Sequence, residues 1–198
     1  MKSFNSILAL PNGKTEKCTK VVDCHLLNEH LQTERFKMED LQLLKEVICK
    51  EDQTIQIDLA SVYHHIPVSK NLKQYLGFKF KRKSYDYAIM RFAHTHVPLT
   101  FQKIIRQTIG YIRSTLQIRC VSYCDDLVFL HLQKEALNLL ITQILGILAK
   151  FGWQVTAEKS DLIQTQQFVY PGQFLNKITN QICITMIKKA QQLQQISK

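Results

Sequence analysis

Two short apolar strands joined by three residues constrain this fold more than any other feature of the sequence. We predict strands over residues 118–123 and 127–132, separated by Cys124-Asp125-Asp126. Adjacent carboxylates close to a core raise each other's pKa and lose hydration, so a positively charged partner is expected nearby. The alternative interpretation is an ordinary turn, in which aspartate is common.

A third carboxylate, Asp58, strengthens the case for a functional site. Residues 54–59, TIQIDL, alternate so that Ile55, Ile57 and Leu59 face one way and Asp58 lies on the polar face. If this strand neighbours the hairpin, Asp58 and Asp125 converge, and two carboxylates can bridge two hard cations for in-line phosphoryl transfer. A solvated residue at the end of a strand is the alternative.

The remaining periodicity predicts an α+β domain with helices packed on a mostly antiparallel sheet. An amphipathic helix is expected over residues 38–49, a second from Pro98 to Ile112, and a strongly apolar third over 134–150 with Gly152 at its C-terminal cap. Further strands are expected at 20–24, 75–80, 84–90, 155, 162–163 and 168–170.

Composition narrows the class of partner. The 198 residues include 26 Lys+Arg and 16 Asp+Glu, a net charge of +10, which favours a polyanion such as nucleic acid. Neither a membrane segment nor a signal peptide is recognisable, so we expect an intracellular protein of the cytoplasm or nucleus, not a secreted one. The cysteines lack framework spacing and predict free thiols; a zinc site of Cys18, Cys24, His25 and His30 is a minor alternative.

Five segments, in order along most of the chain, resemble the reverse transcriptase domain of LTR-type retroelements, close to the gypsy-like and DIRS-like families. These segments are VVDCHLLNEHL at 21–31, IDLASVYHHIPV at 57–68, YLGFKF at 75–80 with MRFAHTHVPLTF at 90–101, SYCDDLVF at 122–129, and GWQVTAEKS at 152–160. The resemblance implies a right-hand polymerase palm, an antiparallel sheet with helices on one face, plus partial fingers and no thumb. It places fingers at about 1–53 and 64–97, palm at about 54–63 and 98–175, and a tail or the start of a thumb connection at 176–198.

The resemblance also implies roles for single residues. Asp58 and Asp125 would bind two Mg²⁺ ions, with Mn²⁺ as a substitute, Asp126 would complete the site, and Lys159 would protonate or neutralise the pyrophosphate leaving group. The residues implied in nucleotide binding are Lys20, Leu59, Ala60, Ser61, Val62, the steric gate Tyr63, and Phe92. Those implied in primer and template binding are Lys79, Lys81, Arg82, Lys83, Arg91, Tyr123, Pro171 and Gly172.

The implied reaction is transfer of a nucleotide from a dNTP to a primer 3′-hydroxyl on an RNA or DNA template, within a retrotransposon polyprotein. Its partners would be RNA template, DNA primer, dNTPs and, in the parent element, thumb, RNase H and integrase or recombinase domains, with no membrane.

Departures from the family pattern keep two alternatives open. Thr19 and His25 stand where the fingers motif carries arginines, Ala93 replaces a glycine, and Pro171 replaces a leucine. A decayed domain that only binds nucleic acid is therefore the first alternative, and a basic scaffold that binds neither dNTP nor RNA is the second.

Overall fold

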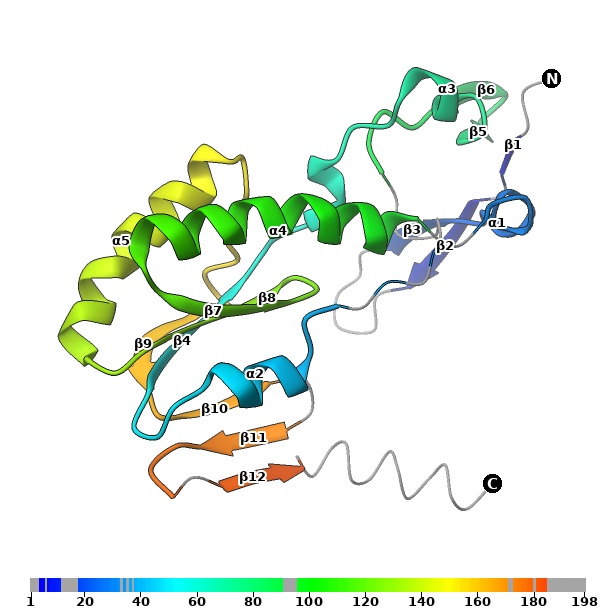
Figure 1. Ribbon diagram of the computed structural model, residues 1–198. Coiled ribbons are helices and arrows are strands. Elements are labelled where there is room, and N and C mark those ends of the chain that lie inside the picture. The colour runs from blue at the N-terminus through cyan, green and yellow to red at the C-terminus, as the bar shows by residue number, and fades with distance from the viewer. Residues whose placement is uncertain are drawn as a thin grey trace, which may run out of the picture. The chain divides into compact units, whose positions relative to one another are not determined.

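The computed structural model describes residues 4–5, 7–11, 18–32, 34, 36, 38–90, 96–170, 173–179 and 181–184. The chain divides into two compact units (Figure 1). Unit 1 comprises Met1–Phe36 and Ser61–Ile104, and unit 2 comprises Lys37–Ala60 and Ile105–Lys198. Each is described by itself.

A four-stranded antiparallel sheet forms the centre of unit 2, in the order β7-β8-β4-β9. Its strands are β7 (Arg119–Tyr123), β8 (Asp126–His131), β4 (Gln53–Asp58) and β9 (Asp161–Thr165). In β4 the predicted inward-facing residues Ile55 and Ile57 are buried, as is Leu59 just after the strand. The predicted hairpin and the predicted strand 54–59 are therefore neighbours, since β4 pairs with β8 along its length.

Helices α4 (Val97–Leu116) and α5 (Lys134–Lys150) lie on one side of this sheet in Figure 1. In the unit 2 part of α4, Ile105, Ile109 and Ile112 are fully buried, and their spacing of four and three residues forms one helical face. Helix α5 ends at the residue that the sequence predicts. Gly152 then takes a φ of +85°, a conformation that glycine adopts without strain.

The other side of the sheet carries α2 (Leu41–Val47) and a second antiparallel sheet, β10-β11-β12. Its strands are β10 (Gln167–Tyr170), β11 (Gln173–Asn176) and β12 (Gln181–Ile184). Leu44 of α2 packs with Val121, Val128 and Tyr170 in a hydrophobic core cluster. Helix α2 is shorter than the predicted 38–49 at both ends. At its start, the Asp40 carboxylate accepts hydrogen bonds from two amides of the first turn, and at its end Ile48 already has an extended backbone.

Unit 1 is built from short elements. It contains the antiparallel pair β2 (Ile7–Pro11) and β3 (Cys18–Val22), and a sheet of β1 (Phe4–Asn5), β5 (Gly77–Phe80) and β6 (Lys83–Asp86). Its helices include α1 (His25–Glu29), the 3₁₀ helix η1 (Val62–His65) and α3 (Lys70–Lys73). The β5–β6 hairpin confirms the prediction. The expected strand over 20–24 ends at Val22, and a helix that we did not predict starts at His25.

Candidate active site

The turn of the β7–β8 hairpin presents two carboxylates. Tyr123 and Asp126 are register partners, so the loop contains only Cys124 and Asp125. Two-residue hairpin loops require a positive φ at their first residue, and Cys124 has a φ of +52°. Asp125 therefore stands at the tip of the hairpin, and Asp126 is the first residue of β8.

Asp58 lies beside this turn because β4 ends there. It is the register partner of Asp126 across the β4–β8 pair, and directly opposite residues hold their Cβ atoms about 4.5–5.5 Å apart. The Leu59 amide donates to the Asp125 carbonyl oxygen at 2.9 Å, which ties the end of β4 to the turn. The three carboxylates thus gather at one end of the central sheet.

A third segment, residues 154–160, holds the end of β4 from its other side. The Thr156 amide donates to the Asp58 carbonyl oxygen at 2.8 Å, and the Asp58 amide donates to Ser160 Oγ at 3.0 Å. The Ala60 amide donates to the Gln154 carbonyl oxygen at 2.8 Å. The backbone at Asp58 is therefore hydrogen-bonded to both neighbouring segments, and these bonds fix the position of its Cα atom.

The segment 154–160 also places Lys159 beside the carboxylate of Asp58. Lys159 Nζ lies 3.7 Å from Asp58 Oδ2; the lysine side chain is 68% exposed and the aspartate side chain 12%. An ion pair with an exposed partner stabilises a fold only weakly, so this lysine remains available to a ligand.

The charge of the cluster is unbalanced. Although Asp126 is an exposed residue, partial desolvation raises the pKa of its carboxyl group, and the negative charges of Asp125 and Asp58 raise that pKa further. Lys159 lowers it, but it is a single cation against three acids. A divalent cation would relieve this repulsion.

The donor set fits Mg²⁺ or Mn²⁺ in chemical kind. Both are hard cations that prefer carboxylate oxygens. Among the described residues, no three His, Cys, Asp or Glu side chains are arranged as a metal-holding group. Mg²⁺ is commonly bound by one or two carboxylates together with substrate phosphates, so the absence of such a group is compatible with this ion.

The predicted site residues are distributed over both units. Leu59 and Ala60 follow Asp58 in unit 2, whereas Ser61, Val62 and Tyr63 begin the second segment of unit 1. Ser61 precedes η1 with a left-handed φ of +49°. The Tyr63 ring packs edge-to-face on Phe101 within unit 1, with centroids 5.7 Å apart.

Tyr123 packs against the core beneath the hairpin turn. Its ring meets that of Tyr170 at a steep angle, with centroids 6.3 Å apart. Burial raises the pKa of the Tyr170 hydroxyl, and Glu39 and Asp126 raise it further. Tyr170 therefore stays protonated beside the acidic cluster.

The predicted basic run forms the tip of the β5–β6 hairpin in unit 1. Lys79, Lys81, Arg82 and Lys83 are all exposed. Lys81 and Arg82 have positive φ angles of 46° and 63°, and Lys81 Nζ lies 5.6 Å from the centre of the Phe80 ring. Five predicted positions cannot be placed: Arg91, Phe92, Pro171 and Gly172 lie outside the described residues, as does the side chain of Lys20.

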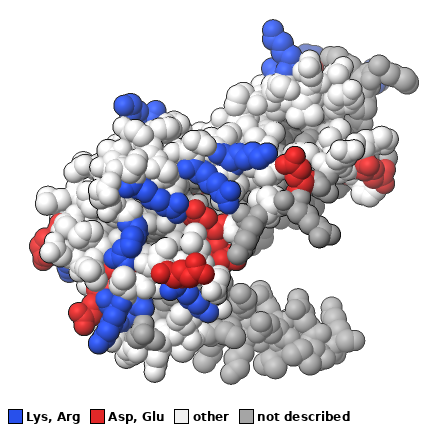
Figure 2. All heavy atoms as spheres, in the orientation of Figure 1, with Lys and Arg blue, Asp and Glu red and all other residues white. Residues whose placement is uncertain are grey.

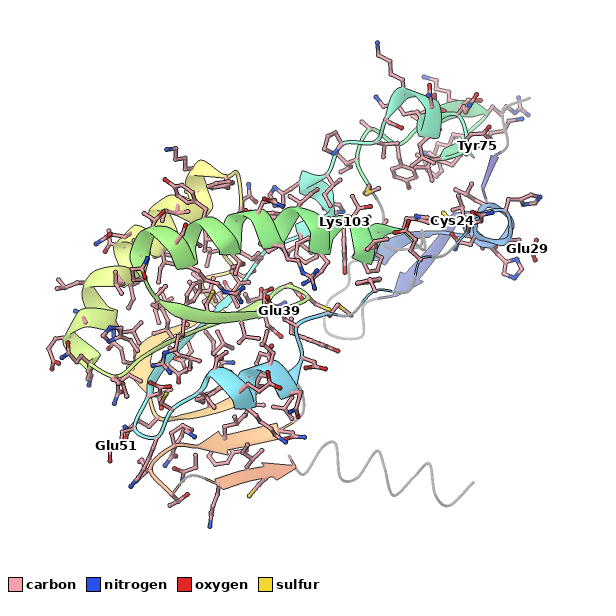
Figure 3. The ribbon with its side chains drawn as sticks, viewed as in Figure 1. Cys24, Glu29, Glu39, Glu51, Tyr75 and Lys103 are labelled. Carbon is pink, nitrogen blue, oxygen red and sulfur yellow. The ribbon has the colours of Figure 1, made fainter. Side chains whose placement is uncertain are left out.

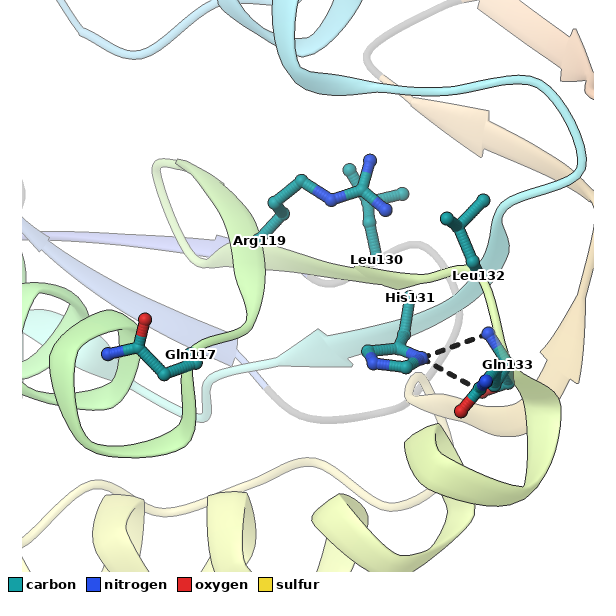
Figure 4. Close-up of a pocket in the computed structure, with 6 residues that line it drawn as sticks. All are labelled: Gln117, Arg119, Leu130, His131, Leu132 and Gln133. Carbon is teal, nitrogen blue, oxygen red and sulfur yellow. Dashed lines mark hydrogen bonds between the residues drawn. The ribbon is translucent and has the colours of Figure 1, made fainter.

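Two hollows of unit 2 have none of the three aspartates in their lining. One, of about 400 Å³, lies at the end of β7 and β8 away from the turn and is lined by Arg119, His131 and Gln133 among others (Figure 4). In it the Gln133 amide donates to His131 Nδ1 at 2.9 Å. The other, of about 280 Å³, lies beside α2 and includes Glu39, Asp40 and Arg106.

The sequence did not predict several residues that support the site. The Ser160 hydroxyl, which accepts the Asp58 amide, lies in a recognised motif but had no assigned role. Two partly buried ion pairs lie beside β7: Glu39 with Arg113 of α4, and Asp52 with Arg119, the first residue of β7. No periodic pattern marks such pairs, because their partners are 67 and 74 residues apart.

Comparison with known proteins identifies the family. The family model described as reverse transcriptase (RNA-dependent DNA polymerase) matches residues 7–175. Among curated proteins, the chain is 28% identical over 120 residues to the Gag-Pol polyprotein of Walleye dermal sarcoma virus. It is 27% identical over 108 residues to the retrovirus-related Pol polyprotein from transposon 297 of Drosophila melanogaster. These matches cover 60% and 54% of the chain but only 7% and 10% of the two polyproteins.

Solved structures share the fold. The foamy viral protease-reverse transcriptase in complex with an RNA/DNA hybrid aligns with a TM-score of 0.77 and 15% identity, over 96% of this chain and 25% of that one. The same protein in complex with dsDNA aligns with a TM-score of 0.78 and 18% identity, over 95% of this chain and 38% of that one. The α+β polymerase fold that the sequence predicts is confirmed, and the chain belongs to the reverse transcriptase family of retroelements.

Proposed function

We propose that this chain carries out template-directed DNA synthesis as the reverse transcriptase domain of a retroelement polyprotein. The observation that carries the proposal is the gathering of Asp58, Asp125 and Asp126 at one end of the central sheet, next to Lys159. Family membership supplies the reaction class, because an arrangement of three carboxylates alone is compatible with several phosphoryl-transfer reactions.

In the proposed reaction Asp58 and Asp125 would hold two divalent cations, and Asp126 would be the third carboxylate of the site. Mg²⁺ or Mn²⁺, when bound, would supply Lewis acidity at the primer 3′-hydroxyl and charge neutralisation at the triphosphate. The 3′-hydroxyl loses its proton to solvent, its oxygen attacks the α-phosphorus in line, and the bond from that phosphorus to pyrophosphate breaks. Lys159, which is paired with Asp58, would donate a proton to the departing pyrophosphate or neutralise it.

Substrate positioning is assigned to the remaining predicted residues. We propose that the backbone from Leu59 to Val62 lies along the triphosphate and that Tyr63 excludes a 2′-hydroxyl, with Lys20 and Phe92 as further nucleotide contacts. The central sheet of unit 2 would be the palm, and unit 1 would contribute fingers. Two foamy virus structures hold an RNA/DNA hybrid and dsDNA, which supports a primer and template as partners here.

Primer extension on an RNA template with dNTPs and Mg²⁺ tests the proposal. The wild-type chain is expected to extend the primer, and Asp125→Asn to reduce extension by at least about a hundredfold, because the substitution removes a charge needed at the reacting phosphate. Glu135→Gln, which removes an exposed carboxylate from the first turn of α5, is the matched control and should leave extension unchanged. Equal extension by wild type and Asp125→Asn would contradict the proposal.

The same assay tests the first alternative. A domain that only binds nucleic acid would retain RNA without copying it, and Asp125→Asn would leave its affinity unchanged. Detectable copying by the wild-type chain excludes that alternative.

A further inference from the structure

The outer edge of β7 is bonded to side chains. β7 is an edge strand of the central sheet, and it pairs with β8 on one side only. On its other side, Arg113 Nη2 donates to the Cys120 carbonyl oxygen at 2.6 Å, and the Ser122 amide donates to Glu39 Oε2 at 2.8 Å. The two side chains thus replace a neighbouring strand over the three residues that lead to Tyr123.

Glu39 and Arg113 are also bonded to each other. Arg113 Nη2 lies 3.0 and 2.9 Å from the two Glu39 carboxylate oxygens, and the Glu39 side chain is only 9% exposed. The Ser122 hydroxyl donates a further hydrogen bond to Glu39 at 3.3 Å. The carboxylate has four short contacts in all, so removing it would leave the Ser122 amide without its acceptor and the partly buried guanidinium without its counter-charge.

The segment that carries Glu39 is anchored on both of its sides. Met38 Sδ lies 3.7 Å from Cys124 Sγ, in the turn itself, and Asp40 caps α2. Figure 3 labels Glu39 between α2 and the β7–β8 hairpin, in agreement with these contacts. Residues 38–40 therefore run along β7 as far as the loop that holds Asp125.

We infer that Glu39 and Arg113 form a positioning pair that closes the edge of β7 and holds the Cys124-Asp125 turn in place. Within the described part of the chain, neither side chain is in hydrogen-bond or ion-pair contact with the three aspartates, so the pair acts through Ser122 and Cys120. The inference rests on the proposed function for its catalytic consequence. Its structural consequence, an ordered turn, can be measured whether or not the chain copies RNA.

The chain provides a control of matched chemistry. At the far end of the same strand, Arg119 donates to both carboxylate oxygens of the fully buried Asp52, at 2.6 and 2.7 Å. This pair is as short as the first but lies at the start of β7, away from the turn. Arg119→Lys should therefore lower the urea midpoint without changing the position of Asp125.

The experiment compares Glu39→Ala, Glu39→Gln and Arg119→Lys with the wild-type chain. The first readout is amide hydrogen exchange over residues 120–126, and the second is the division between kcat and the dNTP KM in primer extension. Glu39→Ala should accelerate exchange at 122–126 and lower kcat about tenfold with little change in KM, because a small displacement of a catalytic group slows chemistry. Glu39→Gln should retain part of the exchange protection at 122–126 and part of kcat, since its amide oxygen can still accept a hydrogen bond from Ser122. Arg119→Lys should change neither.

The outcomes distinguish a failure of the positioning role of Glu39 from a failure of the proposed function. Unchanged exchange at 122–126 in Glu39→Ala overturns the positioning role, as does an Arg119→Lys effect on kcat of the same size. An inactive wild type overturns the proposed function alone, because the exchange data still show whether Glu39 holds the turn. If Glu39→Ala does not fold, Glu39→Gln supplies the same comparison.

Discussion

The pKa of the Cys120 thiol on β7 is shifted by its buried surroundings. Its thiol is buried, and this desolvation raises its pKa to about 11 from an ordinary value of 9.0. The positive charge of Arg113 lowers the pKa but only partly offsets the effect of burial. The folded chain therefore keeps the thiol protonated at pH values where the unfolded chain has lost the proton.

This difference predicts alkaline destabilisation. Because the folded pKa is raised, the contribution of Cys120 is fully present below pH 9 and is lost as the pH rises toward 11, by up to about 3 kcal/mol. Cys120→Ala should show a smaller loss of unfolding free energy between pH 9 and 11, measured by urea denaturation. Cys49→Ala, which removes an exposed thiol, is the control. Identical pH dependence in Cys120→Ala and wild type would contradict this account.

At the scale of elements, the tip of the β5–β6 hairpin combines strain with charge. Lys81 and Arg82 both have positive φ, the conformation of a two-residue turn that favours Asn-Gly. Such angles cost a non-glycine residue about 1–2 kcal/mol. No hydrogen bond or ion pair between Arg82 and another described residue offsets this cost, which supports the proposed role of Lys81 and Arg82 in binding template.

Replacing Lys81-Arg82 with Asn-Gly should therefore stabilise the hairpin and weaken RNA binding. We expect the unfolding free energy to rise by about 1 kcal/mol, since the strain is relieved. Thermal denaturation and fluorescence anisotropy with labelled RNA measure the two effects. A Lys81→Gln, Arg82→Gln double variant is the control, because it removes the same charges and keeps the strain. It should lose affinity without gaining stability, and a gain equal to that of Asn-Gly would contradict the strain argument.

The sequence predicted elements where one pattern continued for long enough. Helix α5 repeats its apolar face over 17 residues, and β4 alternates up to Asp58, so both were located and Asp58 could be paired with the hairpin. Strands β11 (QFLN) and β12 (QICI) are four residues each, too short to show a clear alternation. Each is a strand through its pairing with a neighbour, β11 with β10 and β12 with β11, and no local pattern marks that pairing. Glu39 escaped prediction for the same reason: its role depends on Ser122, 83 residues away.

For the whole molecule, the net charge of +10 favours the proposed binding of nucleic acid. Figure 2 shows lysine and arginine side chains interspersed with acidic ones on the face that it draws. No helix among the described residues is long and apolar enough to cross a membrane. If the chain binds RNA as proposed, the positive charge should supply affinity by releasing counterions from the phosphates.

This mechanism predicts steep salt dependence. If the four cations of the β5–β6 hairpin each neutralise one phosphate, the logarithm of RNA affinity should fall with the logarithm of salt at a slope of about −3. Lys83→Gln should reduce the slope by about one, and Glu135→Gln should leave it unchanged. Fluorescence anisotropy with labelled RNA, measured between roughly 50 and 200 mM salt, gives this slope. A slope near zero would favour the basic scaffold that binds no RNA.

The most direct measurement is the location of a bound divalent cation. Mn²⁺, a paramagnetic substitute for Mg²⁺, broadens the NMR signals of amides close to it. Substoichiometric Mn²⁺ should first broaden the signals of residues 57–59 and 124–127, and Asp125→Asn should abolish this effect. Broadening beside α2, at the hollow that includes Glu39 and Asp40, with residues 57–59 and 124–127 unaffected, would contradict it.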